Sequence, residues 1–270
     1  MITNSWIGSY GRLGNQMFQL AFLVAQARRL GTRAFVNVEQ PGFLLGPYLS
    51  AGLVDVLPAR SYAARYAAEV DGVFEERGWN WSEETMQGPD RVDYRGYFQS
   101  ERYFTNVAAE VRRCFGSPAI DSDTRATASF LCDRTLVQVR SGDSYAAHPQ
   151  FHVNLHNTDY HQRALSTLTE RFDGLEPKVA VTTDEFHRWR GRLPFYAVDV
   201  VYLADIGDPV SDLWLASQCE HYVIANSSFG WWAAWLRVSP EQQVIAPAAW
   251  FGCEGPHPYD GVYCQDWTVL

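Results

Sequence analysis

Three short polar segments, each directly after an apolar run typical of a buried strand, carry side chains that could bind a phosphorylated ligand. Arg140 can pair with phosphate oxygens through two parallel N–H groups. The segment from Asn226 to Ser228 begins a helix, whose first N–H groups and dipole attract anions. These residue types together predict a site for a nucleoside diphosphate. The runs and segments are residues 135–139 with Arg140 to Asp143, 178–182 with Thr183 to Glu185, and 222–225 with Asn226 to Ser228.

Group transfer from a nucleotide diphosphate would give Arg140 a catalytic role. Negative charge develops on the leaving phosphate, and oriented N–H donors stabilise it. The acceptor hydroxyl also needs a base or hydrogen-bond acceptor. Asp143 is a candidate for this base, but it is equally suited to orient Arg140, so both roles stay open. Its competitors lie just downstream at His148, His152, His156 and Asp159.

Residues 226–236 form the most informative single segment, Asn-Ser-Ser-Phe-Gly-Trp-Trp-Ala-Ala-Trp-Leu. Its apolar residues recur at three- and four-residue spacing, which predicts a helix with a buried face. Asn226 and the serines suit the helix start because their oxygens can accept its first N–H groups. A capped core helix and an anion site at its N-terminus both fit this pattern. We interpret the tryptophans as core packing rather than as a platform for a sugar.

The elements that must position these residues alternate between strand and helix beyond residue 118, which predicts a doubly wound parallel sheet. Ligands bind such sheets at the C-terminal ends of the strands. Near the N-terminus, a strand over residues 2–7, a glycine-rich loop, a helix over 15–30 and a further strand open a second parallel unit. Residues 115–118 break the helical pattern. We therefore expect two Rossmann-like α/β domains, 1–117 and 118–270, facing each other across a cleft.

Composition narrows the class of protein. The 270 residues carry a formal net charge of −9, which argues against a general nucleic-acid-binding protein. The 5 cysteines are widely spaced with no Cys-x-x-Cys pair, as expected for reduced thiols. No apolar run is long enough to span a membrane and no signal peptide is visible. We expect a cytoplasmic protein with at most peripheral contact with the inner face of the membrane.

Three tempting motifs have better explanations than a metal or nicotinamide site. Asp121-Ser122-Asp123 has a D-x-D form, but it precedes a helical run and suits a helix cap. The glycine loop is not G-x-G-x-x-G, which weakens a nicotinamide role. His148, His152 and His156 are spaced by four, but Pro149 argues against a helical metal pair. We expect neither a metal nor a resident cofactor.

The motifs as a whole resemble glycosyltransferase family 11, the α-1,2-fucosyltransferases that use GDP-fucose. The resemblance covers almost the whole chain, and it implies a two-domain GT-B fold, inversion at the sugar carbon and no metal requirement. The matching segments are Gly11 to Gln19, Gly96 to Phe104, Val139 to Asp143, Thr183 to Glu185 and Asp212 to Leu236.

The resemblance and the strand-end argument together give a set of expected site residues. Arg140 and Asp143 are the expected catalytic residues. The expected donor-binding residues are Gly14, Asn15, Gln138, Arg140, Asp184, Asn226, Ser227, Ser228 and Phe229. The expected acceptor-binding residues are Arg12, Gln99 and His152. The implied substrates are GDP-fucose and a galactoside in an oligosaccharide or lipid-linked glycan, with fucose moved to the galactose 2-hydroxyl.

Two positions depart from the family's H-x-R-R-G-D signature. Gln138 stands for its histidine and Ser141 for its second arginine. The glutamine amide can still hydrogen-bond a purine edge, whereas the serine removes one phosphate partner. A related transferase for another nucleotide-activated sugar, and a non-catalytic nucleotide- or sugar-binding module, therefore stay open as alternatives. The sequence does not indicate the oligomeric state.

Overall fold

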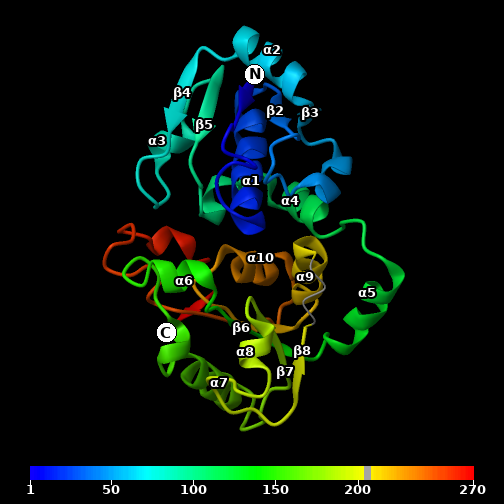
Figure 1. Ribbon diagram of the computed structural model, residues 1–270, viewed down its shortest axis with the longest axis vertical. Helices are drawn as coiled ribbons and strands as arrows, with labels where there is room; N and C mark the ends of the chain where they lie inside the picture. Colours follow the sequence, from blue (N-terminus) through cyan, green and yellow to red (C-terminus); the bar gives the residue numbers. More distant parts are fainter. Residues whose placement is uncertain (204–207) are drawn as a thin grey trace. The chain divides into compact units, whose positions relative to one another are not determined.

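The computed structural model describes residues 1–203 and 208–270, apart from the side chains at positions 50, 51, 143 and 144 (Figure 1). The chain forms two compact units. Unit 1 is Met1–Ala119 with His257–Cys264, and unit 2 is Ile120–Pro256 with Gln265–Leu270. The structure differs from the expected domains 1–117 and 118–270 because residues 257–264 pack with unit 1: the Asn80 side chain donates to Asp260 at 2.8 Å and accepts from the Gly261 N–H at 2.9 Å.

Unit 1 contains a parallel sheet in the order β3-β2-β1-β5-β4. The central strand β1 is shorter than the expected run over residues 2–7. It ends because Asn4 Oδ1 accepts the Trp6 N–H at 2.9 Å and starts a turn. The strands are β1 Ile2–Thr3, β2 Ala34–Asn37, β3 Asp55–Leu57, β4 Gly72–Glu75 and β5 Val92–Arg95.

Helix α1, Leu13–Leu30, packs on β1 and β2 of this sheet (Figure 1). It begins two residues before the expected start because the Arg12 carbonyl already accepts the Asn15 N–H at 3.0 Å. As expected, it ends at Gly31, whose φ of 61° suits a residue without Cβ. The other α-helices of unit 1 are α2 Ala59–Glu69, α3 Glu83–Met86 and α4 Ala108–Phe115.

Unit 2 contains the predicted doubly wound parallel sheet, in the order β11-β10-β9-β6-β7-β8. Figure 1 shows α9 and α10 on one side of the sheet and α7 on the other. The strands are β6 Thr135–Val139, β7 Val179–Thr183, β8 Val200–Tyr202, β9 His221–Val223, β10 Val244–Ala246 and β11 Thr268–Val269. The helices are α5 Ser122–Thr127, α6 Asp143–Ala147, α7 Tyr160–Arg171, α8 Phe186–Trp189, α9 Pro209–Ala216 and α10 Ser228–Leu236.

The tryptophans of α10 lie in the core, as their spacing predicted. Trp231 and Trp232 are fully buried and Trp235 is 4% exposed.

The two parallel sheets confirm the expectation of two Rossmann-like α/β domains. Among the described residues, no helix combines the length and apolarity needed to cross a bilayer. Short 3-10 helices lie at Gly46–Ala51, Glu101–Tyr103, Thr105–Val107, Ala128–Phe130, Leu155–Asn157 and Asp260–Val262.

Candidate functional site

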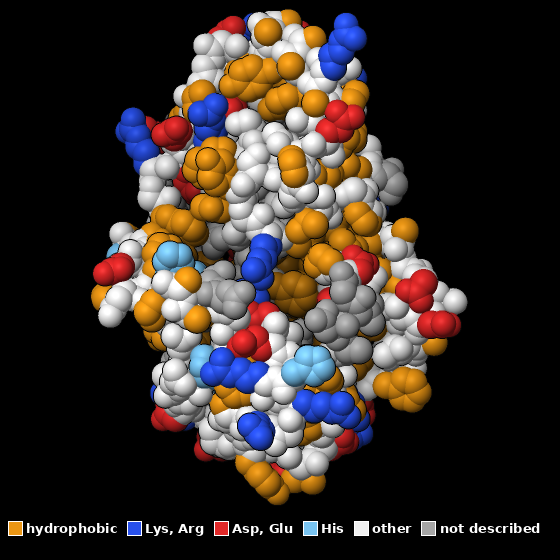
Figure 2. Space-filling view, viewed as in Figure 1, with side chains coloured by type: hydrophobic (Ala, Val, Ile, Leu, Met, Phe, Trp, Pro, Cys, Tyr) orange, Lys and Arg blue, Asp and Glu red, His pale blue; other side chains and the backbone are white. Residues whose placement is uncertain are grey.

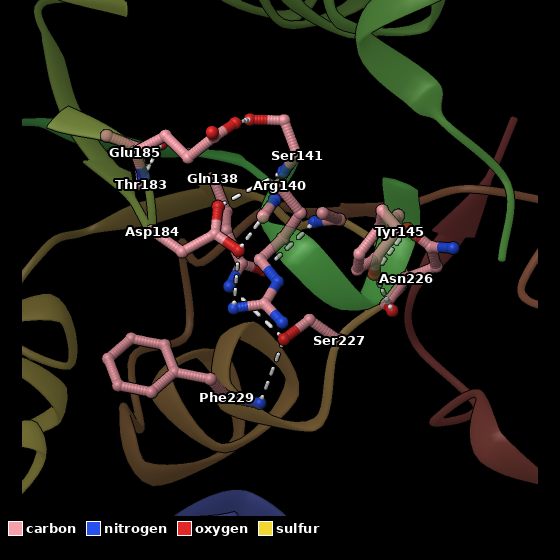
Figure 3. Close-up of polar contacts among 12 residues, drawn as sticks. Gln138, Arg140, Ser141, Tyr145, Thr183, Asp184, Glu185, Asn226, Ser227 and Phe229 are labelled. Carbon is pink, nitrogen blue, oxygen red and sulfur yellow. Dashed lines mark hydrogen bonds and ion pairs between the residues drawn. The ribbon is translucent and has the colours of Figure 1, made fainter. Parts of the chain in front are cut away.

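The three polar segments meet at one edge of the unit 2 sheet. The chain runs from β6 outward through β7 and β8, then returns to the other side of β6 as β9. The strand order therefore reverses between β6 and β9, and a crevice at such a point is where open α/β sheets bind ligands. Figure 3 shows residues from the loops after β6, β7 and β9 gathered at this place.

Arg140 lies at the centre of the group. Its Nη1 pairs with Asp184 Oδ2 at 3.1 Å, and its buried Nε has no hydrogen-bond partner among the described residues. The guanidinium carbon lies 5.4 Å from the ring centre of Tyr145. Figure 3 shows the guanidinium directed toward Ser227, at the start of α10. Asp184 thus holds one edge of the Arg140 guanidinium. The Arg140 side chain remains 20% exposed, which leaves it accessible to a ligand.

Asp184 is occupied by the chain itself. Its Oδ1 accepts the Ser141 N–H at 3.1 Å, and its Oδ2 accepts the Gly142 N–H at 3.0 Å besides pairing with Arg140. A Cβ at Gly142 would lie 2.5 Å from Oδ2, so the close approach requires glycine. Asp184 thus acts as a clamp that fixes the loop after β6 and the position of Arg140. Its expected contact with the donor stays a prediction.

The N-terminus of α10 is capped as expected. Ser227 Oγ accepts the Phe229 N–H at 3.3 Å, and the side chain of Gln138 donates to the same oxygen at 3.3 Å. Ser228 is the first helical residue and is half-buried, so its N–H and hydroxyl lie at the open end of the helix. An anionic ligand beside Arg140 would meet this positive end of the helix dipole.

Gln138 is buried inside unit 2. It is 2% exposed, and its Oε1 accepts the Ala225 N–H at 3.2 Å. A Cβ at Gly230 would lie 2.1 Å from this oxygen, so α10 approaches β6 more closely than a larger residue would allow. Direct contact with the donor was expected for Gln138. The observed contacts instead make it a brace between β6 and the start of α10.

Asn226 was also expected to contact the donor, but its side chain is used within the domain. Its amide donates to the carbonyls of Val153 and Trp250 at 3.2 and 3.1 Å. The Tyr145 hydroxyl donates to its carbonyl groups, at 2.9 Å to the backbone and 3.1 Å to the side chain. Asn226 therefore holds the loop before α10 in place.

Ser141 joins the loop after β6 to helix α8. Its hydroxyl donates to Glu185 and accepts the indole N–H of Trp189 at 2.6 Å. The residue is 4% exposed. The position at which the family carries a second arginine is therefore a buried polar junction here. Trp189 was missed as a supporting residue because no short-range spacing links it to Arg140, and Tyr145 was missed because an aromatic residue in that position carries no distinctive pattern.

The candidate bases differ in how they are held. The ring of His152 stacks on Tyr145 at 4.6 Å, and burial, followed by the charge of Arg140, lowers its pKa. His156 Nδ1 lies 3.1 Å from the Arg140 carbonyl, and Asp159 pairs with Arg163 at 3.5 Å. The side chain of Asp143 lies outside the described residues, although its backbone starts α6. His152 is thus a half-buried imidazole whose pKa is lowered by burial and by Arg140.

The remaining expected site residues belong to unit 1. Asn15 Oδ1 accepts from the Gln99 side chain at 2.8 Å, so these two amides lie together. Gly14 is buried within α1, and Arg12 is exposed at the N-cap position of that helix. The expected site residues therefore form two groups, one in each unit.

Nothing in the described part of the chain brings together three or more His, Cys, Asp or Glu side chains that could hold a metal ion. The D-x-D segment caps α5, since Asp121 Oδ1 accepts the N–H groups of Asp123 and Thr124 at 3.0 and 2.9 Å. Basic and acidic side chains are interspersed on the face shown in Figure 2. Arg140 and the N-terminus of α10 are the sources of positive potential that the structure places together at this edge of the sheet (Figure 3).

Two Rossmann-like parallel α/β domains, one with an arginine and a capped helix at its switch point, fit the class of GT-B glycosyltransferases. The chain belongs to glycosyl transferase family 11, whose model matches residues 3–270.

Relatives in this family act on different sugars by name. An α-1,2-colitosyltransferase of Escherichia coli is 29% identical over 284 residues, covering 93% of this chain and 93% of that protein. Galactoside α-(1,2)-fucosyltransferase 2 of Mus musculus is 27% identical over 249 residues, covering 85% of this chain and 67% of that protein. The fucosyltransferase NodZ from Bradyrhizobium superposes with a TM-score of 0.46 at 16% identity, covering 87% of this chain and 93% of that one.

Proposed function

We propose that this glycosyltransferase is an inverting α-1,2-fucosyltransferase that moves L-fucose from GDP-β-L-fucose to the 2-hydroxyl of a galactoside. The observation that carries the proposal is that Arg140 is directed toward the N-terminus of α10 at the switch point of unit 2 (Figure 3). This arrangement suits a diphosphate, because a forked cation and helix N–H groups both bind phosphate oxygens. The acceptor is an oligosaccharide or a lipid-linked glycan.

Leaving-group stabilisation is the role proposed for Arg140. As the bond from the sugar to the β-phosphate breaks, negative charge grows on the phosphate oxygens. Donors that are already oriented stabilise this charge without reorganising. Asp184 holds the guanidinium on one side, through the 3.1 Å ion pair, and leaves its other N–H groups directed toward the start of α10 (Figure 3).

The acceptor hydroxyl attacks from the sugar face opposite the leaving group, which inverts the anomeric centre. Asp143 and the imidazole of His152 are the two groups proposed to take its proton. The variants Asp143→Asn and His152→Gln separate them. Loss of the base should lower kcat by roughly 10²- to 10⁴-fold while leaving GDP affinity unchanged. If neither variant lowers kcat, both residues are excluded as the base.

The departures at 138 and 141 bear on donor identity. Both side chains are hydrogen-bonded within unit 2 rather than directed into the crevice. Transfer of colitose is a second candidate, favoured by the 29% identity to the colitosyltransferase. Colitose is L-fucose without its 3-hydroxyl, so the two donors differ by one polar group. A site that hydrogen-bonds this hydroxyl discriminates strongly, whereas an apolar wall does so weakly.

The test is turnover on a donor and acceptor panel. The full-length protein is incubated with GDP-fucose or GDP-colitose and with lactose, methyl β-galactoside or methyl β-glucoside. We expect GDP release with GDP-fucose and a galactoside, and proton NMR should show an α-linkage at the galactose 2-hydroxyl. A β-linked product would contradict inversion, and another linkage site would contradict the regiochemistry. Nucleotide binding without turnover on any acceptor would favour the non-catalytic binding module.

A further inference from the structure

Aromatic rings converge at the C-terminal edge of the unit 1 sheet. Trp6, Trp79 and Tyr97 follow β1, β4 and β5, which are consecutive in the order β1-β5-β4. Tyr97 stacks on Trp79 with ring centres 4.9 Å apart and an angle of 28° between the planes. Trp6 meets Tyr97 edge-on at 5.7 Å. All three residues are half-buried, and Tyr10, 4.7 Å from Trp6, is 52% exposed.

This aromatic cluster differs from the core aromatics beside it. Phe22 and Phe98 are fully buried and stack at 3.7 Å beneath the edge, so the core does not need the outer rings to fill it. Half-exposed tryptophan and tyrosine rings are retained where one face must stay apolar and the other meets polar groups.

The backbone that carries Tyr97 is held in an unfavourable conformation. Phe98 has a φ of 53°, a conformation that bulky residues rarely adopt because it is strained. Glu76 Oε2 fixes this turn by accepting the N–H groups of Tyr97 and Phe98 at 2.7 and 3.0 Å. A Cβ at Gly96 would lie 2.4 Å from the Cβ of Glu76, so the turn approaches this residue closely. The hydrogen bonds to Glu76 therefore hold the strained turn, and with it Tyr97, in a fixed position.

Polar side chains border the same segment. Gln99 donates to Asn15 at 2.8 Å, which ties the turn to the glycine-rich loop. The buried oxygens Glu76 Oε1 and Ser100 Oγ have no hydrogen-bond partner among the described residues. A sugar ring combines an apolar C–H face with peripheral hydroxyls, and such ligands are held by aromatic surfaces with a few placed polar groups.

We propose that Trp6, Trp79 and Tyr97 form the platform on which the pyranose ring of the acceptor galactoside binds. The axial 4-hydroxyl of galactose leaves several C–H bonds on one face, and such a face packs against an aromatic ring. The proposal rests on the proposed function for the identity of the acceptor. The rings themselves lie within unit 1, so acceptor binding is separable from donor binding by unit 2.

Acceptor kinetics with lactose give the first test. Trp79→Ala and Tyr97→Ala should each raise the KM for lactose by roughly tenfold, the loss expected when an aromatic anchor is truncated. The KM for GDP-fucose and its slow hydrolysis without acceptor should stay within about twofold, since neither depends on the platform. Tyr97→Phe keeps the ring and should retain the wild-type KM. Phe130→Ala removes a ring that is 73% exposed in unit 2 and serves as the matched control.

Binding without turnover gives a second test that does not depend on the donor. Saturation-transfer-difference NMR of lactose with nucleotide-free protein should show signals from the galactose ring protons. At the same lactose concentration, these signals should be much weaker in Trp79→Ala and Tyr97→Ala and unchanged in Phe130→Ala. Absent ring-proton signals in the wild type, or unchanged signals and KM in both platform variants, would overturn the platform even if the protein transfers fucose. Normal platform signals without fucose transfer would overturn only the proposed donor.

Discussion

At the scale of single residues, Arg140 has a different role from the polar residues around it. It is the cation directed toward α10, whereas Asp184, Gln138 and Asn226 are hydrogen-bonded within the domain. Arg140→Ala should lower kcat/KM by roughly 10²- to 10³-fold, as for other lost oxyanion donors. Arg140→Lys keeps the charge but not the fork, and should recover only part of that loss. Steady-state kinetics with intact circular dichroism spectra measure this, and near-normal turnover in Arg140→Ala would remove it from the site.

Asp184 should behave as a clamp. In Asp184→Asn, one acceptor oxygen becomes an N–H₂ group that faces the N–H of Ser141 or Gly142, so a backbone hydrogen bond is lost. An unsatisfied buried donor costs about 1–3 kcal/mol. We therefore expect both a lower midpoint of urea unfolding and weaker GDP binding. Unchanged stability with weaker binding would instead indicate a direct contact between Asp184 and the nucleotide.

Glu76 predicts a pH dependence of stability. Burial raises the pKa of its carboxyl to about 7, against the hydrogen bonds from Phe98 and Tyr97 that lower it. Because the folded pKa lies above the unfolded one, the contribution to stability is complete below about pH 4.5. It is lost as pH rises toward 7, by up to about 1.4 kcal/mol per pH unit.

The matched variant for this effect is Glu76→Gln, whose amide oxygen can still accept the two N–H groups. Urea unfolding at pH 5 and pH 8 should show that the variant gains stability relative to wild type at the higher pH. An equal difference between the two proteins at both pH values would show that Glu76 does not titrate in this range.

At the scale of elements, the helix ends could be predicted where a single residue, such as a glycine or a capping serine or aspartate, determines the local conformation. Gly31 ends α1, Asp121 caps α5 and Ser227 caps α10, each by a local hydrogen-bonding pattern visible in the sequence. The inward orientation of Gln138 was not predictable, because it depends on the approach of Gly230 from a helix 92 residues later in the chain. The same holds for Ser141 and its partner Trp189.

The cap of α10 gives a prediction at this scale. Ser227→Ala removes the oxygen that accepts the Phe229 N–H and the Gln138 amide. The loss of an N-cap serine costs about 1 kcal/mol. Chemical denaturation should show this decrease, and GDP affinity should fall because the helix terminus frays. Ser228→Ala leaves the cap in place and should keep wild-type stability.

At the scale of the whole molecule, alternation of strands and helices was enough to predict two parallel α/β domains. It was not enough to assign residues 257–264, which lie between two segments of unit 2 in sequence but belong to unit 1. That return depends on hydrogen bonds between Asn80 and residues 260 and 261, about 180 positions apart. Contacts of such long sequence separation leave no local pattern.

A second prediction at the scale of the whole molecule is that turnover does not require a metal ion. Positive potential for the diphosphate is proposed to come from Arg140 and the α10 terminus, so turnover should survive incubation with EDTA. Initial rates before and after chelation measure this. Loss of turnover with EDTA and its recovery on adding Mg²⁺ or Mn²⁺ would show that a divalent ion takes part in leaving-group stabilisation.

Calorimetric titration of the full-length protein with GDP tests the central claim most directly. If unit 2 is the donor domain of a GDP-sugar transferase, GDP should bind at one site per chain, and UDP and dTDP should bind more weakly. Arg140→Ala should weaken GDP binding, whereas Phe130→Ala should leave it unchanged. Equal or tighter binding of a pyrimidine nucleotide, or unchanged GDP affinity in Arg140→Ala, would contradict the assignment of this crevice to a GDP-sugar.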